Sequence, residues 1–163
     1  MRKTDKYRYV LVLIGLVVLH FTVRGRLGDD RIAPDFLLLA LLIYTVRAQP
    51  GRSAAAGFVI GLLRDALTPA SFGAGALAHT VVGYLAAWGR AVFFPDNLLV
   101  NAGLFAAGVM LRNTLMLLAS GTPAGQLSAG LLVWAPLQAL TTAAAGVVIL
   151  LLFRNWFAIR IEV

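Results

Sequence analysis

The feature of this sequence that most constrains its fold is a series of six apolar segments joined by short polar loops. The segments lie at about residues 9–23, 34–46, 53–67, 72–94, 98–119 and 127–153. A helix that crosses a bilayer needs about 20 apolar residues. Lipid cannot bond to backbone N–H and C=O groups, so a spanning segment must satisfy them internally, as a helix does. The pattern predicts an all-α polytopic membrane protein, a compact bundle of about six transmembrane helices.

The composition of the chain agrees with this prediction. Of its 163 residues, 60% are hydrophobic and only 13% are charged. A soluble protein of this size could not bury so many apolar side chains. Six spans with short loops occupy the whole sequence, so we expect a single integral membrane domain over residues 1–163 and no separate catalytic domain.

The second and third segments, 34–46 and 53–67, are short for a bilayer that is about 30 Å thick. Only six residues separate them, and Pro50 and Gly51 in this linker favour a turn. We therefore expect a tight helical hairpin that is tilted or incompletely spanning. If the hairpin counts as one crossing, the bundle has five spans.

The distribution of basic residues predicts the orientation of the chain. With a cytoplasmic N-terminus and six spans, nine basic residues lie on the inner side and four on the outer side, while Arg112 lies within a span. Cytoplasmic loops carry an excess of Lys and Arg. This favours a multi-pass protein with both termini in the cytoplasm, whereas five spans would place the C-terminus outside.

Several function classes are disfavoured by the residues present. The net charge of +7 comes from basic residues that flank the apolar segments, as expected for lipid headgroups and not for nucleic acid. The chain has no cysteine, and neither His20 nor His79 has a partner at metal-ligand spacing. No phosphate-binding loop or nucleophile motif is present. We expect that the protein has no catalytic residue, metal or cofactor and that it is not an enzyme.

A set of polar residues within the apolar segments is the best candidate for a functional site, because charges inside a membrane are costly. In the six-span topology these residues share the outer half of the bilayer: Asp35, Asp65, Arg112, Arg64 and Asn113. Arg112 could therefore pair with Asp65 or with Asp35. The cluster is interpreted as a structural ion pair, a partner-binding or ligand-binding site, or an element of proton or ion coupling.

Small residues mark where helices can approach closely. Gly57 and Gly61 form a GxxxG motif in the third segment, and Gly83 continues the pattern in the fourth. Such motifs mediate close helix packing in membranes. The contact is either internal to the bundle or made with another protein.

The stretch from Ala33 to Arg90 resembles the rod shape-determining protein MreD family. The resemblance rests on Pro34-Asp35 before an apolar run, on Gly57-Phe58-x-x-Gly61-Leu62-x-x-Asp65, and on a downstream segment beginning Phe72-Gly73. It implies a non-enzymatic component of the bacterial inner membrane that belongs to the cell-elongation machinery. The implied direct partner is MreC. RodA and a class B penicillin-binding transpeptidase are implied as further partners, and MreB is implied as a partner through direct or indirect contact.

The resemblance also leaves a second function open. The MreD fold is similar to that of substrate-binding S-components of energy-coupling-factor transporters, so the alternative is a subunit that captures a vitamin. Such a subunit needs convergent polar groups and aromatic faces, and the outer half of this chain offers few. In the scaffold interpretation, the bundle presents a lipid-facing groove to the MreC span. Self-association and bound lipid also stay open.

Overall fold

The computed structural model describes residues 3–66, 72–89 and 97–153. These residues form helices and no strands, which confirms the prediction of an all-α protein. The helices are α1 Lys3–Thr22, α2 Phe36–Thr45, α3 Pro50–Asp65, α4 Ala74–Gly89, α5 Leu98–Ala119, α6 Ala124–Ala129 and α7 Ala135–Leu152. A five-residue π-helical turn, Gly130–Trp134, joins α6 to α7 into one long rod. With α6 and α7 counted together, the described residues form six helical rods.

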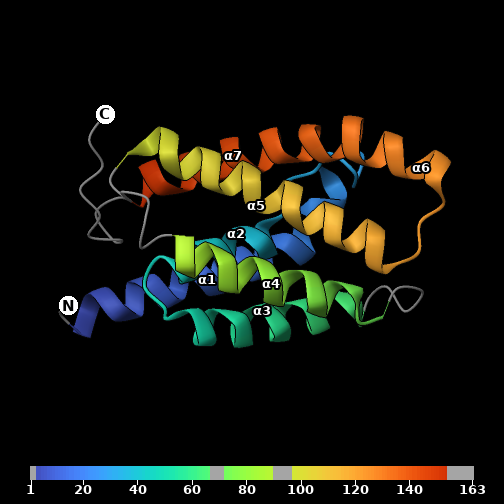
Figure 1. Ribbon diagram of the computed structural model, residues 1–163. Coiled ribbons are helices and arrows are strands. Elements are labelled where there is room, and N and C mark those ends of the chain that lie inside the picture. The colour runs from blue at the N-terminus through green and yellow to red at the C-terminus, as the bar shows by residue number, and fades with distance from the viewer. Residues whose placement is uncertain (1–2, 67–71, 90–96, 154–163) are drawn as a thin grey trace.

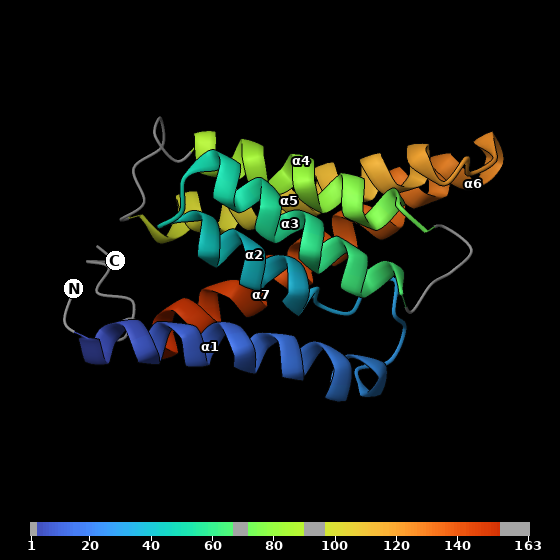
Figure 2. The ribbon, with the colours of Figure 1, turned by 90° about the horizontal axis from the view of Figure 1, so that it is seen from below.

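Consecutive rods run in opposite directions along the bundle (Figures 1 and 2). The first described helix begins at the same end at which α7 finishes (Figure 1). An even number of antiparallel rods requires this arrangement. A short 3₁₀ turn, Arg24–Arg26, follows α1 at the opposite end.

The observed helices differ from the predicted segments mainly at their ends. Helix α5 covers the predicted segment 98–119, while α1 begins several residues before residue 9. Helix α4 starts two residues later than predicted. Residue 67 and residues 90–94, where the third and fourth segments were expected to end, lie outside the described residues.

Helix α2 is the core of the bundle. All residues from Phe36 to Ile43 are buried, and Leu37, Leu38 and Leu39 have no exposed surface. A helix that is apolar on all sides is stable only when it is surrounded, and its 10 residues span about 15 Å. Helices α1, α3, α4, α5 and α7 all contact it.

Helices α2 and α3 are consecutive, run in opposite directions and contact each other, as the expected hairpin requires, but this is not the main contact of α3. Helix α3 packs most extensively against α4 and much less against α2 (Figure 2). The physical reason is glycine content, because α3 and α4 can approach each other more closely than either can approach the leucine-rich α2. A Cβ added at Gly57 would meet the carbonyl of His79, and one added at Gly61 would meet the backbone of Ala76.

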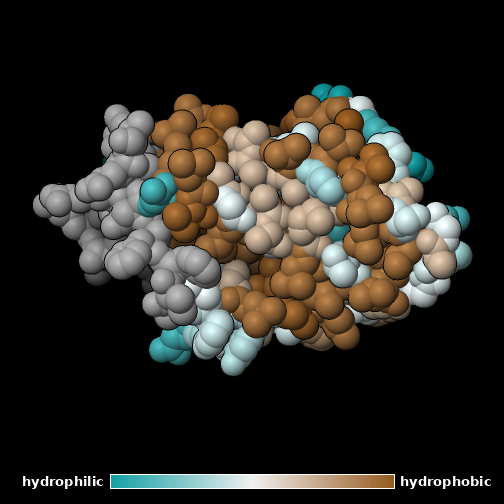
Figure 3. Space-filling view, turned by 45° about the horizontal axis from the view of Figure 1, so that its top comes forward, coloured by the Kyte–Doolittle hydropathy of each residue, from teal (hydrophilic) through white to brown (hydrophobic). Residues whose placement is uncertain are grey.

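Two of the described helical stretches are long and apolar enough to cross a membrane, Leu98–Ala119 and Ala124–Leu152. The stretches Tyr7–Thr22 and Phe36–Thr45 are apolar but shorter. Figure 3 shows a face that is predominantly hydrophobic over the middle of the bundle, with hydrophilic residues toward both ends. This is the surface pattern that a bilayer requires.

Candidate functional site

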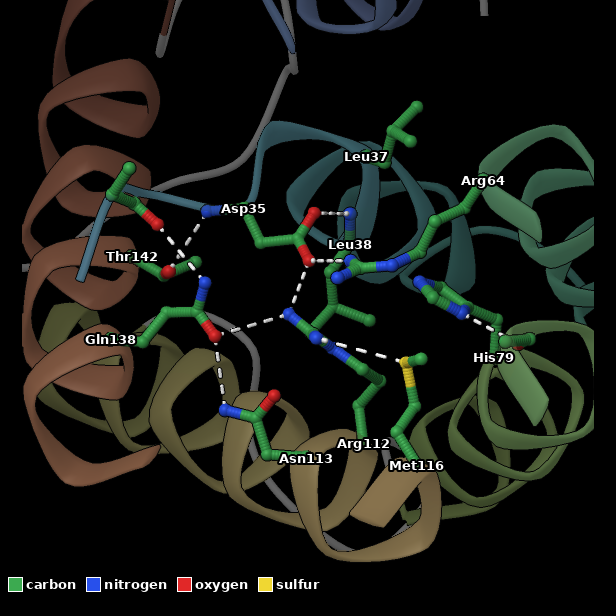
Figure 4. A network of polar contacts seen from close by, with 12 residues as sticks. Asp35, Leu37, Leu38, Arg64, His79, Arg112, Asn113, Met116, Gln138 and Thr142 are labelled. Atoms are coloured by element: carbon green, nitrogen blue, oxygen red, sulfur yellow. Dashed lines mark hydrogen bonds and ion pairs between the residues drawn. The ribbon is translucent and has the colours of Figure 1, made fainter. Parts of the chain in front are cut away.

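Asp35 is the centre of a buried polar network at the start of α2 (Figure 4). Its Oδ1 accepts a hydrogen bond from the backbone N–H of Leu38 at 3.0 Å, so the side chain caps α2. Its own backbone N–H donates to Oγ1 of Thr142 on α7 at 3.1 Å. Pro34 has no N–H to satisfy and restricts the backbone just before the cap. Asp35 is thus fixed by both its main chain and its side chain.

Two guanidinium groups from different helices converge on the other carboxylate oxygen of Asp35. Nη2 of Arg112, from the middle of α5, donates to Oδ2. Nη1 of Arg64, from the end of α3, donates to the same oxygen at 2.9 Å. Asp35 is completely buried and the Arg112 side chain is only 3% exposed. The pair therefore has little solvent screening, and each partner depends on the other for its charge.

Gln138 on α7 extends the network to a second layer. Its Oε1 accepts from Nη2 of Arg112 at 3.3 Å and from Nδ2 of Asn113 at 3.0 Å. Its Nε2 donates to the carbonyl of Ala33 at 3.1 Å. The amide thus joins α5 to the segment that leads into α2. Its buried polar atoms are satisfied, which buried amides require.

Gln138 and Thr142 are functional-site residues that were not predicted from the sequence. The available signal was their spacing, because polar residues four positions apart lie on one face of a helix. Within the apolar segment 127–153 this pattern marks a face that turns toward polar partners. Thr141, next to them, donates to the carbonyl of Ile32.

Asp65 does not belong to this network, which makes the proposed Asp65–Arg112 pair wrong. Its carboxylate accepts three backbone N–H groups at the start of α4, those of Gly73 at 2.9 Å, Gly75 at 3.0 Å and Ala76 at 2.9 Å. The free N–H groups of a helix N-terminus attract a carboxylate strongly. Asp65 is therefore an anchor between α3 and α4.

The glycine motif quoted for the family resemblance has a consistent structural basis. Gly73 has a φ of +98°, which favours glycine, and Gly75 leaves room for the Asp65 carboxylate. Gly83 lies against the backbone of Ser53. These contacts, like those of Gly57 and Gly61, are internal to the α3–α4 pair. By contrast, Phe58 points outward and is half exposed, and Leu62 is partly buried.

The two histidines lie close to the network without forming a metal site. His79 is fully buried, and its Nδ1 lies 2.8 Å from the carbonyl of Gly75. Nδ1 of His20 lies 3.6 Å from Oδ1 of Asp35. Among the described residues, no group of three or more potential metal ligands comes together.

A cavity of about 950 Å³ opens beside the network. It lies between the end of α1, the loop at residues 24–31, α5 and the rod formed by α6 and α7. Its lining includes Trp134 and Gln138. It also includes four arginines, Arg24, Arg31, Arg64 and Arg112. The cavity was not foreseen, because it depends on how a loop and the π-helical turn are placed relative to α5.

The loop side of the cavity is held by Arg24. Its Nη2 donates to the carbonyl of Asp30 at 2.8 Å, and its Nε lies 3.8 Å from Oδ1 of the same residue. Partial burial lowers the pKa of the Arg24 guanidinium, and the carboxylate of Asp35 opposes that shift. Across the opening, the guanidinium of Arg31 lies 5.1 Å from the ring centroid of Trp134, within cation–π range.

Comparison with known proteins identifies the family. The chain matched no curated protein and no solved structure. A family model described as rod shape-determining protein MreD matches residues 3–157, which includes every residue that the structure describes. The bundle, the Asp35 network and the α3–α4 anchor all lie within the matched region. The chain therefore belongs to the MreD family and has a role in rod shape determination.

Proposed function

We propose that this protein is a non-enzymatic, multi-pass scaffold of the bacterial inner membrane that binds MreC and thereby helps to control peptidoglycan synthesis. The observation that carries the proposal is the family match over the entire described bundle. The function then belongs to the membrane bundle itself. MreC is the direct partner, while RodA, the class B transpeptidase and MreB act with it in the same machinery.

The bundle is suited to a scaffold role because its polar contacts stabilise a single arrangement of helices. The Asp35 network joins α2, α3, α5 and α7, and Asp65 joins α3 to α4. A rigid surface can bind one conformation of a partner in preference to others and so shift its population. In this proposal the buried charges position the helices, and the partner contacts their outer faces.

The helix glycines indicate which outer faces a partner span can approach most closely. Gly57 and Gly61 are used internally, so they are not available for MreC. In the interior of the described helices, Gly15 on α1 and Gly103 on α5 have open space around the position of a Cβ. Small residues let membrane helices approach each other. We infer that the MreC span packs on one of these two faces.

Co-purification tests this proposal directly. The chain is expressed with tagged MreC, extracted in mild detergent and captured through the tag, using wild type, Gly15→Leu and Gly103→Leu. One of the two substitutions should reduce recovery of the complex while both variants keep the wild-type helical content. Absence of a complex with the wild-type chain would contradict direct binding. A complex that neither substitution weakens would contradict the assigned faces.

The orientation can be tested independently. The chain has no cysteine, so single cysteines can be introduced without background. Both Arg26 and Arg52 are exposed. Arg26 ends the turn that follows α1 and Arg52 lies at the start of α3, and these two parts are at opposite ends of the bundle (Figure 1). With a cytoplasmic N-terminus, R26C in intact cells should react with a membrane-impermeant maleimide and R52C should react only after lysis. The reverse pattern would contradict the proposed orientation.

The alternative of a substrate-capture subunit is supported only by the cavity. Its lining includes one tryptophan and several amide and guanidinium groups, which is chemistry that can bind a polar small molecule. Native mass spectrometry of the purified chain separates the two functions. Retention of a vitamin-sized molecule in place of MreC would favour the alternative.

A further inference from the structure

We infer that the arginine-lined cavity is a binding site for the phosphate headgroup of an anionic amphiphile. The first support is size. At about 950 Å³ the cavity lies in the range of ligand sites, roughly 300–1,000 Å³. It is open to the surface, so a headgroup can enter while a hydrocarbon chain stays outside.

The second support is charge. Four guanidinium groups line the cavity, and two carboxylates balance them, Asp30 at the lining and Asp35 behind Arg112. The neighbouring Asp29 is exposed, and its carboxylate accepts the backbone N–H of Arg31 at 2.8 Å. The residues that line the cavity therefore carry an excess of positive charge, which the single negative charge of a phosphodiester headgroup reduces.

The third support is unused hydrogen-bonding capacity at buried donors. Nε of Arg112 is buried and has no hydrogen-bond partner, and the whole side chain is only 3% exposed. Nε of Arg24 is also buried without a hydrogen bond. A buried donor without an acceptor costs free energy, so a small rearrangement of either side chain toward an anion in the cavity would recover part of that cost.

The fourth support is the apolar side of the opening. Phe21 and Trp134 line the cavity beside the arginines, and Phe21 is 44% exposed. The exposed side chains of Leu132 and Val133 belong to the same π-helical turn as Trp134. π-helical turns occur frequently at functional sites. A charged pocket that borders an aliphatic surface fits a ligand that has both a phosphate and an acyl chain.

The arginines also specify what the site should reject. A zwitterionic phosphatidylcholine carries a compensating cation on its headgroup, which would face the guanidiniums of Arg24 and Arg31. Repulsion between these like charges opposes the binding of phosphatidylcholine. The site should therefore prefer phosphatidylglycerol over phosphatidylcholine. Inorganic phosphate shares the recognised group but lacks the chain.

The test uses the full chain in nanodiscs that contain equal amounts of phosphatidylglycerol and phosphatidylcholine. Native mass spectrometry of the released protein measures which lipid is retained. Wild type should retain phosphatidylglycerol. The double variant R24Q/R31Q should lose at least about tenfold in affinity, the loss expected when one or more charge-assisted hydrogen bonds are removed. The control R26Q removes an exposed arginine from the same turn and should bind as wild type does.

A second variant keeps the inference testable if R24Q/R31Q does not fold. Ala129 is exposed and lines the cavity, so A129W would obstruct it without removing a charge. The matched control is A124W, on the same short helix but outside the lining. Loss of phosphatidylglycerol in A129W and retention in A124W are expected.

Inorganic phosphate distinguishes a lipid from a free anion. If phosphate displaces the retained phosphatidylglycerol, the headgroup is the recognised part. If phosphate stabilises the chain against heat and no lipid preference exists, the source is a free phosphate compound. Equal retention of the two lipids without an effect of phosphate would overturn the inference. So would phosphatidylglycerol binding that R24Q/R31Q or A129W leaves unchanged.

Discussion

The carboxylate of Asp35 and the guanidinium of Arg112, which are 77 residues apart in the sequence, form a buried ion pair in the middle of the bundle. Arg64 adds a second cation to the same oxygen. Asp35 is thus the only carboxylate that contacts two guanidiniums within the described residues. Its removal leaves two cations facing each other.

Asp35→Asn should destabilise the protein more than any other single change in the network. It leaves Arg112 buried without a counter-charge and opposite Arg64, and loss of one partner of a buried pair costs about 3–5 kcal/mol. The apparent melting temperature in detergent, followed by circular dichroism, measures the effect. Asp30→Asn is the control, because Asp30 is 74% exposed in the loop just before α2. Equal losses in the two variants would contradict a central role for Asp35.

Arg112→Met should be less harmful than Asp35→Asn, because Asp35 keeps Arg64 as a partner. The double variant D35N/R112M should recover part of the stability lost in D35N, since no unpaired guanidinium then remains at the α5 position. SDS denaturation in mixed micelles gives the free energies of the double-mutant cycle. Additive losses would show that the two side chains do not interact.

Asp65→Ala should loosen α4 from α3. Removal of a helix N-cap costs about 0.5–2 kcal/mol, and the three N–H groups that Asp65 accepts place this case at the upper end. Asp65→Asn should lose less, because an amide oxygen can still accept. The loss of unfolding free energy in Asp65→Ala should add to the loss in Arg112→Met within about 0.5 kcal/mol, as expected for residues that share no partner. A larger coupling energy between the two substitutions would show that Asp65 and Arg112 do interact, contrary to the structure.

The comparison of these two aspartates shows what the sequence could predict. The apolar segments predicted the helices, and the shared depth of Asp35 and Arg112 made their pairing possible. Depth alone could not decide between Asp35 and Asp65. The choice depends on the turn after α3, where Gly73 bends the backbone so that the start of α4 meets Asp65. Such a turn involves few residues and leaves no periodic pattern.

The central position of α2 and the cavity show a second kind of limit. Apolar residues on every side of a helix are consistent with burial in protein and with exposure to lipid, so hydropathy could not distinguish the two. The cavity depends on Arg24 and Arg31 in a loop and on the π-helical turn at Gly130–Trp134. Each of these is a local departure from regular structure, whereas periodicity reports only regular structure.

Gly57→Ala should prevent α3 and α4 from packing correctly. The added methyl group would meet the carbonyl of His79, a backbone atom that cannot move without shifting α4. We expect a loss of roughly 1–3 kcal/mol, the usual cost of overpacking. Gly103→Ala is the matched control, because its Cβ meets no other atom, and the change should stabilise α5 by about 0.5–1 kcal/mol. Thermal unfolding of both variants in one detergent measures the contrast, and opposite signs are expected.

Gln138→Leu should damage the link between α5 and the segment that enters α2. The variant leaves the carbonyl of Ala33 and the amide of Asn113 without the contacts that Gln138 makes, and a buried polar group without a partner costs about 1–3 kcal/mol. Gln126→Leu is the control, because Gln126 also lines the cavity but is exposed. Hydrogen exchange provides the local measurement, because Gln138→Leu should raise the exchange rate of the backbone amides around Ala33 and Asp35. Exchange that is unchanged there, or that rises equally in both variants, would show that Gln138 does not hold this segment in place.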